Sequence, residues 1–181
     1  MESKQLIRIS KYLSKHLRHQ PARIGLTLKQ GGWVEVAVLL QACAQNGFPI
    51  SQAQLEEVVA HNDKKRFSFD ATGMLIRANQ GHSIEVDLQL AAATPPDLLY
   101  HGSAQSNVES ILKIGLRKMA RHHVHLSRDI ETAIKVGSRH GKPVVFAVDT
   151  VAMQQAGYQF WRSDNGVWLV NDVPPQYLRI V

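Results

Sequence analysis

The sequence contains little cysteine, few aromatic residues and no long apolar run. One cysteine, Cys43, occurs in 181 residues, which excludes an internal disulfide and a zinc site built on a cysteine cluster. No stretch reaches the roughly 18 consecutive apolar residues of a membrane-spanning helix. The first ten residues, "MESKQLIRIS", are charged and lack the apolar core of a signal peptide. These absences predict a cytoplasmic protein that has no membrane partner.

Several familiar site signatures are also missing. Neither GxGxxG after a strand nor GxxxxGK[ST] occurs, so the sequence indicates neither a Rossmann dinucleotide site nor a P-loop. HExxH is absent, and the histidines do not follow recognisable zinc-ligand spacing, so we expect no metal. No serine or cysteine nucleophile motif stands out.

Basic residues are what the chain has in excess. Lys and Arg number 21 against 15 Asp and Glu, which gives a formal net charge of +6, and there are nine histidines. Such a balance is typical of proteins that bind nucleic acid or a phosphorylated ligand, although many basic proteins bind neither. A hydrophobic content of 44% is enough for a globular core.

The clearest boundary is the stretch "QLAAATPPDLLY", where Pro95 and Pro96 favour an extended connection. We therefore predict a linker at residues 93–96 between domains at 1–92 and 97–181. Helical and strand patterns occur in both halves, which predicts an α+β fold.

The first half predicts three helices and a hairpin. Apolar residues three or four apart indicate a helix that ends at "LRHQP", a second helix is expected over residues 35–45, and Ser51 is expected to cap a third. A short strand is expected at Trp33–Val34, and "RFSFD" and "MLIRA" flank a turn at 71–73. This is the outline of a winged helix, a common nucleic-acid-binding module.

The second half predicts a sheet with intervening helices. Strands are expected over residues 97–103, 122–127, 143–150 and 166–170, and helices over 106–115, 129–141 and 151–157.

Two candidate sites lie in the first half. Arg18 and His19 end the first helix before Pro21, and either helix capping or a functional role explains them; this stretch by itself favours capping. Arg66 follows Asp63, Lys64 and Lys65, a run that is either a solvated turn or the start of a phosphate-binding strand. The nearby loop "QGHS" is either an ordinary turn or a nucleotide contact.

Further candidates lie in the second half. His101, Gly102 and Ser103 end a strand and form either a strand-to-helix turn with a surface histidine or a ligand site, where glycine permits close approach of a ligand to the backbone. In "RHHVHLS", alternation places Arg121, His123 and His125 on one strand face, which suits anionic oxygens better than zinc. Arg139 either ends a helix or faces a ligand.

Taken together, these motifs resemble those of the NAD⁺-dependent RNA (tRNA) 2′-phosphotransferase family. The resemblance rests on stretches that cover nearly the whole chain: "SKYLSKHLRHQP", "GGWVEV", "NDKKRFSF", "IRANQGHS", "LYHGS", "GLRKMARHHVHLS", "VGSRHGKPVVFAVD" and "FWRSDNGVWL". One departure is Ser103, where many relatives have threonine.

The resemblance implies a winged-helix RNA lobe and an ADP-ribosyltransferase-like NAD lobe. It implies removal of an internal RNA 2′-phosphate, such as a splice junction carries, by its transfer to NAD⁺. The products are 2′-OH RNA, ADP-ribose 1″,2″-cyclic phosphate and nicotinamide, formed through a 2′-phospho-ADP-ribosylated RNA without a metal. A monomer is expected.

The resemblance also assigns residues. The essential tetrad falls on Arg18, His19, Arg66 and Arg121, and the NAD⁺ contacts fall on His101, Gly102, Ser103, His125 and Arg139. Three guanidiniums suit phosphate oxygens, and histidine is the member of the tetrad that can exchange a proton near neutral pH.

Two other functions remain open at this point. One is a transferase on the same scaffold that ADP-ribosylates an RNA or DNA phosphate end without the second step. The other is a non-enzymatic winged-helix protein that binds nucleic acid.

Overall fold

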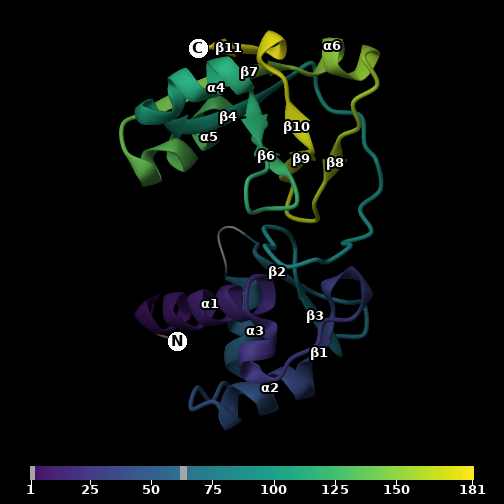
Figure 1. Ribbon diagram of the computed structural model, residues 1–181. Coiled ribbons are helices and arrows are strands. Elements are labelled where there is room, and N and C mark those ends of the chain that lie inside the picture. Colours follow the sequence, from purple (N-terminus) through teal and green to yellow (C-terminus); the bar gives the residue numbers. More distant parts are fainter. Residues whose placement is uncertain (1–2, 62–64) are drawn as a thin grey trace. The chain divides into compact units, whose positions relative to one another are not determined.

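Helices and strands both occur in each half of the chain, so the predicted α+β class is confirmed (Figure 1). The computed structural model describes residues 3–61 and 65–181, and the chain divides into unit 1, Met1–Gln89, and unit 2, Leu90–Val181. Among the described residues, no helix has the length and apolar character needed to cross a membrane.

Unit 1 combines three α-helices with a small antiparallel sheet. The helices are α1 (Ser3–Arg18), α2 (Val36–Gln45) and α3 (Gln52–Ala60), with short 3₁₀ segments η1 (Pro21–Ile24) and η2 (Gln30–Gly32) between α1 and the sheet. The strands β1 (Val34–Glu35), β2 (Phe67–Phe69) and β3 (Leu75–Ala78) pair in the order β1-β3-β2. The predicted helices and hairpin are confirmed, and β1 adds a third strand to the hairpin.

Local sequence signals explain these elements. Ser51 caps α3 through a capping box: its Oγ accepts from the Gln54 backbone N–H at 3.2 Å, and the Gln54 side chain accepts from the Ser51 N–H at 3.0 Å. On α1, the predicted apolar face packs into the core through Ile9, Leu13 and Leu17. Cys43 is buried in the same core, and burial raises the pKa of its thiol to about 11.

Unit 2 is built on antiparallel sheet segments. The strands are β4 (Leu98–Ala104), β5 (Leu116–Arg117), β6 (Val124–Leu126), β7 (Pro143–Asp149), β8 (Trp161–Arg162), β9 (Trp168–Val170), β10 (Asp172–Val173) and β11 (Leu178–Ile180). One segment has the strand order β11-β7-β4, a second has β6-β9-β8, and a third pairs β10 with β5. A bridge between Tyr100 and Ser127 joins β4 to the residue that follows β6.

Short helices connect these strands. They are α4 (Val108–Ile114), α5 (Ile130–Gly137) and α6 (Thr150–Gln155), with 3₁₀ segments η3 (Gln105–Asn107), η4 (Ser138–His140) and η5 (Pro175–Tyr177). The helix predicted to end at residue 141 therefore ends four residues earlier and continues as η4. The strand predicted over 122–127 is shorter, because β6 begins at Val124.

The backbone at Ala92 and Ala93 belongs to unit 2. Ala92 forms a bridge with Trp161, and the Ala93 N–H donates to the Phe160 carbonyl at 2.9 Å. The unit limits at residues 89 and 90 lie a few residues before the linker predicted at 93–96.

Candidate active site

The C-terminus of α1 carries the first group of predicted residues. The backbone N–H groups of His19 and Gln20 both donate to the Lys15 carbonyl, at 3.1 and 3.0 Å, and so close the helix. The Arg18 side chain points away from these carbonyls: its Nη2 donates to the Arg66 carbonyl at 3.5 Å, and its guanidinium lies 6.0 Å from the centre of the Phe67 ring. Capping of α1 therefore does not account for the Arg18 guanidinium.

Arg66 is held from two sides. Its Nη1 donates to Ser10 Oγ on α1 at 3.3 Å, and its carbonyl accepts from the Asn79 N–H at 2.9 Å. The Asn79 side chain, which is 2% exposed, donates to the Lys65 carbonyl at 2.7 Å. The structure thus brings Arg18 and Arg66 together within unit 1. Asp63 and Lys64 of the same predicted motif lie outside the described residues.

The loop "QGHS" is bound to the end of α1. Ser83 donates its backbone N–H to the Arg18 carbonyl at 3.0 Å, and its Oγ lies 2.8 Å from Nδ1 of His19. His82 beside it is 2% exposed. The loop therefore positions two predicted site residues. The sequence alone did not reveal this role of Ser83. The one signal that points to Ser83 is its place in "IRANQGHS", a stretch that resembles the family.

In unit 2, His125 links two other predicted residues. The Arg121 guanidinium donates to Nδ1 of His125 at 3.4 Å. The main-chain carbonyl of His125 accepts a hydrogen bond at 3.0 Å from Nδ1 of His101, on the neighbouring strand β4. Arg121 itself lies in the bend before β6, so its predicted place on the strand is wrong, although its contact with His125 is formed.

The environment of His101 determines its charge. Burial lowers the pKa of His101, and the positive charge of Arg121 lowers it further, against the opposing hydrogen bond to the His125 carbonyl. The ring is therefore neutral at pH 7. Because Nδ1 carries the donated proton, Nε2 is a hydrogen-bond acceptor.

His123 has a packing role. It also precedes β6, and its ring lies 5.1 Å from that of Trp161 in a tilted contact. Burial lowers the pKa of His123, with smaller contributions from His122 and Lys118. Of the histidines in "RHHVHLS", the structure links His125 with Arg121 and packs His123 against an aromatic ring.

Helix α5 covers the glycine on β4. A Cβ on Gly102 would lie 1.7 Å from the Ala133 carbonyl oxygen, and one on Gly137 would lie 2.9 Å from the Ser103 carbonyl oxygen. The two glycines allow the backbones of α5 and β4 to come into contact. Close packing is therefore a structural reason for glycine at position 102, in addition to ligand approach. Ser103 Oγ accepts from Nδ2 of Asn107 at 3.2 Å, and Arg139 is exposed in η4.

Over residues 3–61 and 65–181, no group of three or more His, Cys, Asp or Glu side chains could hold a metal ion. The site residues are arginines and histidines, which bind anionic oxygens and move protons.

The comparisons with known proteins agree with this chemistry. The sequence model of "RNA 2'-phosphotransferase, Tpt1 / KptA family" matches residues 4–172. A protein of Trichormus variabilis is 62% identical over 181 residues, which cover all of both chains. One of Nostoc punctiforme is 63% identical over 179 residues, which cover 99% of each chain.

A more distant relative, from Streptomyces coelicolor, is 55% identical over 179 residues that cover 99% of this chain and 97% of its own. All three bear the name "Probable RNA 2'-phosphotransferase". With nearly full-length matches of this kind, the chain belongs to the Tpt1/KptA family of RNA 2′-phosphotransferases.

Proposed function

We propose that this chain removes an internal 2′-phosphate from RNA by transferring it to NAD⁺. The observation that carries the proposal is the set of contacts around α1: the Arg18 side chain contacts the Arg66 main chain, the Arg66 side chain contacts Ser10, and Ser83 contacts His19. Guanidinium groups suit the binding of a phosphate, and an imidazole suits the transfer of a proton. Family membership supplies the reaction class, RNA 2′-phosphate transfer.

The proposed reaction has two steps. In the first, an oxygen of the RNA 2′-phosphate attacks C1″ of the nicotinamide ribose, and the glycosidic C–N bond breaks with its electron pair leaving on nicotinamide. In the second, the ribose O2″ loses its proton and attacks phosphorus, and the bond from phosphorus to the RNA O2′ breaks. The RNA O2′ takes up a proton, so the products are 2′-OH RNA and ADP-ribose 1″,2″-cyclic phosphate.

The arginines are assigned to the phosphate. Both the nucleophile of step one and the pentavalent phosphorus of step two carry negative charge on phosphate oxygens. Arg18 and Arg66 in unit 1 supply guanidiniums that bind such oxygens through paired N–H groups, and the family resemblance assigns Arg121 in unit 2 to the same reaction. Because NAD⁺ is already an activated glycosyl donor, these arginines serve mainly step two. Variants that lose step one while keeping step two would contradict this assignment.

The histidines receive separate roles. His19 lies exposed at the end of α1, so it provides general acid–base catalysis for the transesterification. His101 is neutral with Nε2 as acceptor, which fits a ribose hydroxyl as its donor. His101, Ser103, His125 and Arg139 of unit 2 bind NAD⁺, and Gly102 keeps α5 against β4 beside them.

The two units take the corresponding parts. Unit 1, with three helices and the sheet β1-β3-β2, is a winged-helix RNA lobe, and unit 2 is an ADP-ribosyltransferase-like NAD lobe. Splice-junction tRNA is a natural source of the 2′-phosphate. A cytoplasmic location and a monomeric state stay predictions.

The test is incubation of the chain with a 2′-phosphorylated RNA oligonucleotide and NAD⁺, followed by mass spectrometry of the products. Nicotinamide, 2′-OH RNA and the cyclic phosphate are expected together. A stable ADP-ribosyl–RNA conjugate would instead indicate a transferase that stops after step one. RNA binding without nicotinamide release would indicate a non-enzymatic binder.

Matched variants sharpen this test. Arg66→Gln removes a proposed phosphate ligand, and Arg23→Gln removes an arginine that contacts Gln20 at 3.4 Å. We expect loss of cyclic phosphate formation for the first variant and near wild-type turnover for the second. Equal activity of the two would refute the phosphate role of Arg66.

A further inference from the structure

Four exposed cations line one face of α1. Lys4, Arg8, Lys11 and Lys15 follow at spacings of four, three and four residues, which place them on one side of a helix. The opposite side of α1 is buried in the unit 1 core. The helix sequence "SKQLIRISKYLSKHLR" contains no acidic residue. We call these four side chains the cationic stripe.

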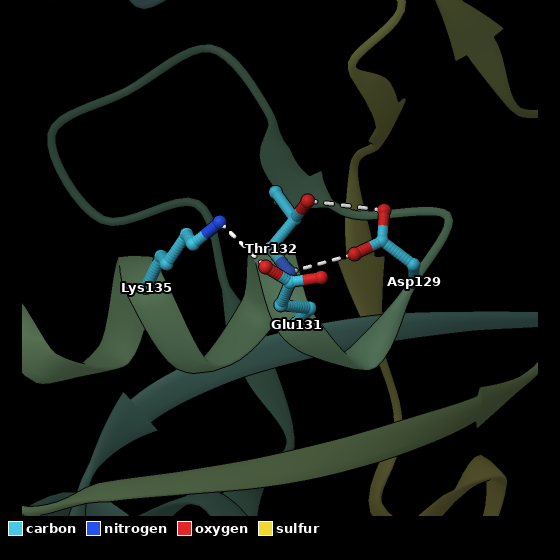
Figure 2. Close-up of polar contacts among 4 residues, drawn as sticks. All are labelled: Asp129, Glu131, Thr132 and Lys135. Atoms are coloured by element: carbon cyan, nitrogen blue, oxygen red, sulfur yellow. Dashed lines mark hydrogen bonds and ion pairs between the residues drawn. The ribbon is translucent and has the colours of Figure 1, made fainter.

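Helix α5 shows how the same chain arranges charge for stability (Figure 2). Asp129 caps α5 by accepting from the Thr132 backbone N–H at 2.7 Å, and Glu131 lies in the first turn. Lys135, in the last turn, pairs with Glu131 at 2.7 Å. Acids at the start, a cation at the end and an i,i+4 pair all favour the helix electrostatically.

The cationic stripe breaks these rules. Lys4 lies in the first turn, where the positive end of the helix dipole disfavours a cation. Neighbouring like charges at i,i+3 and i,i+4 destabilise a helix by about 0.2–0.5 kcal/mol per pair. Within residues 3–61 and 65–181, the side chains of Lys4, Lys11 and Lys15 form no ion pair or hydrogen bond that could offset this repulsion.

The fourth cation of the stripe is held in place. The Arg8 guanidinium lies 5.0 Å from the centre of the Phe48 ring, so its position is fixed by a cation–π contact and not by a carboxylate. A set of positive charges that weakens its own helix is explained by a polyanion that binds it from outside.

We propose that the cationic stripe binds the sugar–phosphate backbone of the RNA whose 2′-phosphate is held at the end of the same helix. This inference rests on the proposed function, because it takes Arg18 and Arg66 as the 2′-phosphate ligands. Lys4 and Lys15 are about 16 Å apart along the axis at ~1.5 Å per residue. That length matches about five phosphates of a helical strand at ~3.4 Å each.

The chemistry of the stripe defines what it recognises. Ammonium groups on flexible stems bind phosphates without reading bases, so the stripe contributes affinity and orientation and no sequence preference. An RNA strand that extends past the 2′-phosphate is therefore bound more tightly than a minimal substrate, whatever its sequence.

The experiment compares the full chain with the triple variant Lys4→Gln/Lys11→Gln/Lys15→Gln. The dissociation constant for 2′-phosphorylated RNA of roughly twelve nucleotides is measured without NAD⁺ at salt concentrations from about 0.05 to 0.2 M. Loss of three phosphate contacts lowers the slope of log affinity against log salt by about 2, at ~0.7 per contact for a single strand. Wild type then loses about 15–20-fold more affinity than the variant over that range.

A matched control removes three cations elsewhere, as Lys29→Gln/Lys113→Gln/Arg179→Gln. These side chains are exposed, and Lys29 is paired with Glu35. We expect this control to keep the wild-type slope. Equal slopes for all three proteins would overturn the proposal. The same decrease of the slope in both variants would also overturn it, because net charge alone would then explain the decrease.

Turnover separates this proposal from the proposed function. A 2′-phosphorylated trinucleotide does not reach along the stripe, so the triple variant should process it at the wild-type rate. If the wild-type protein does not turn over this substrate, the proposed function is refuted. The salt dependence of RNA binding would still test whether the cationic stripe binds RNA. Loss of binding to anionic lipid vesicles in the triple variant, with unchanged RNA slopes, would assign the stripe to a membrane surface and overturn its assignment to RNA.

Discussion

Replacement of Ser83 by alanine tests whether the loop after β3 acts through His19. The Ser83 hydroxyl lies 2.8 Å from Nδ1 of His19, and the change removes this hydrogen bond. The backbone N–H of Ser83 still donates to the Arg18 carbonyl, so the loop stays attached to α1. A neutral hydrogen bond contributes about 0.5–1.5 kcal/mol, which corresponds to a drop of roughly 2–13-fold in kcat if the bond orients the catalytic imidazole.

The assay is a double-mutant cycle on 2′-phosphate transfer. If Ser83 acts through the imidazole, Ser83→Ala lowers kcat in the wild-type background and has no further effect on the His19→Ala protein. Ser83→Thr keeps a hydroxyl and should restore most of kcat. Ser138→Ala, which removes another exposed hydroxyl bonded to the Lys135 carbonyl at 3.1 Å, is the matched control. An equal loss of kcat with and without His19 would refute the reasoning.

Three further predictions concern stability and reactivity. Gly102→Ala places a Cβ 1.7 Å from the Ala133 carbonyl oxygen, so we expect about 3 kcal/mol less free energy of unfolding by urea titration; an unchanged midpoint would contradict the packing of α5 on β4. Asp129→Ala removes the α5 cap and should cost about 1 kcal/mol at pH 7. Hydrogen bonds from Thr132 lower the pKa of Asp129 in the folded state. The difference in the free energy of unfolding between wild type and variant is therefore complete above the unfolded-state pKa of about 3.9, and it shrinks as the pH falls through the lower folded-state pKa. A difference that stays constant down to pH 2 would argue against the cap. Cys43, with a pKa of about 11, should react with iodoacetamide at pH 8 at least ~100-fold more slowly than free cysteine, and labelling at the free rate would show that the thiol is not buried.

Elements of unit 1 that depend on neighbouring residues could be predicted from the sequence. The apolar spacing of α1, the Ser51 cap of α3 and the β2–β3 hairpin are all encoded within a few residues of chain. The contact between Ser83 and His19 spans 64 positions and depends on how the loop after β3 folds back. No local pattern encodes such a contact, so the sequence revealed the candidate residues of unit 1 but not what holds them.

Unit 2 shows a second limit of sequence reasoning. Strands of two residues, such as β5 and β8, are too short for alternation to develop, and pairing with β10 and β9 defines them. Gly102 was predicted as a place where a ligand approaches the backbone, and the structure shows that the carbonyl of Ala133 also approaches it closely. A ligand and a main-chain carbonyl at this position would both require glycine, so a single sequence does not show which of the two is present.

In each unit, one residue contacts two candidate site residues, one of them through its main chain and the other through its side chain. In unit 1, Ser83 binds Arg18 through its backbone N–H and His19 through its hydroxyl. In unit 2, His125 binds His101 through its carbonyl and Arg121 through its imidazole. A side-chain substitution that leaves the backbone in place keeps the main-chain contact, so variants at either residue test its side chain. Substitution of His125 should therefore release Arg121 and remove the His125 ring, while the His101 ring keeps its hydrogen bond to the main-chain carbonyl of residue 125.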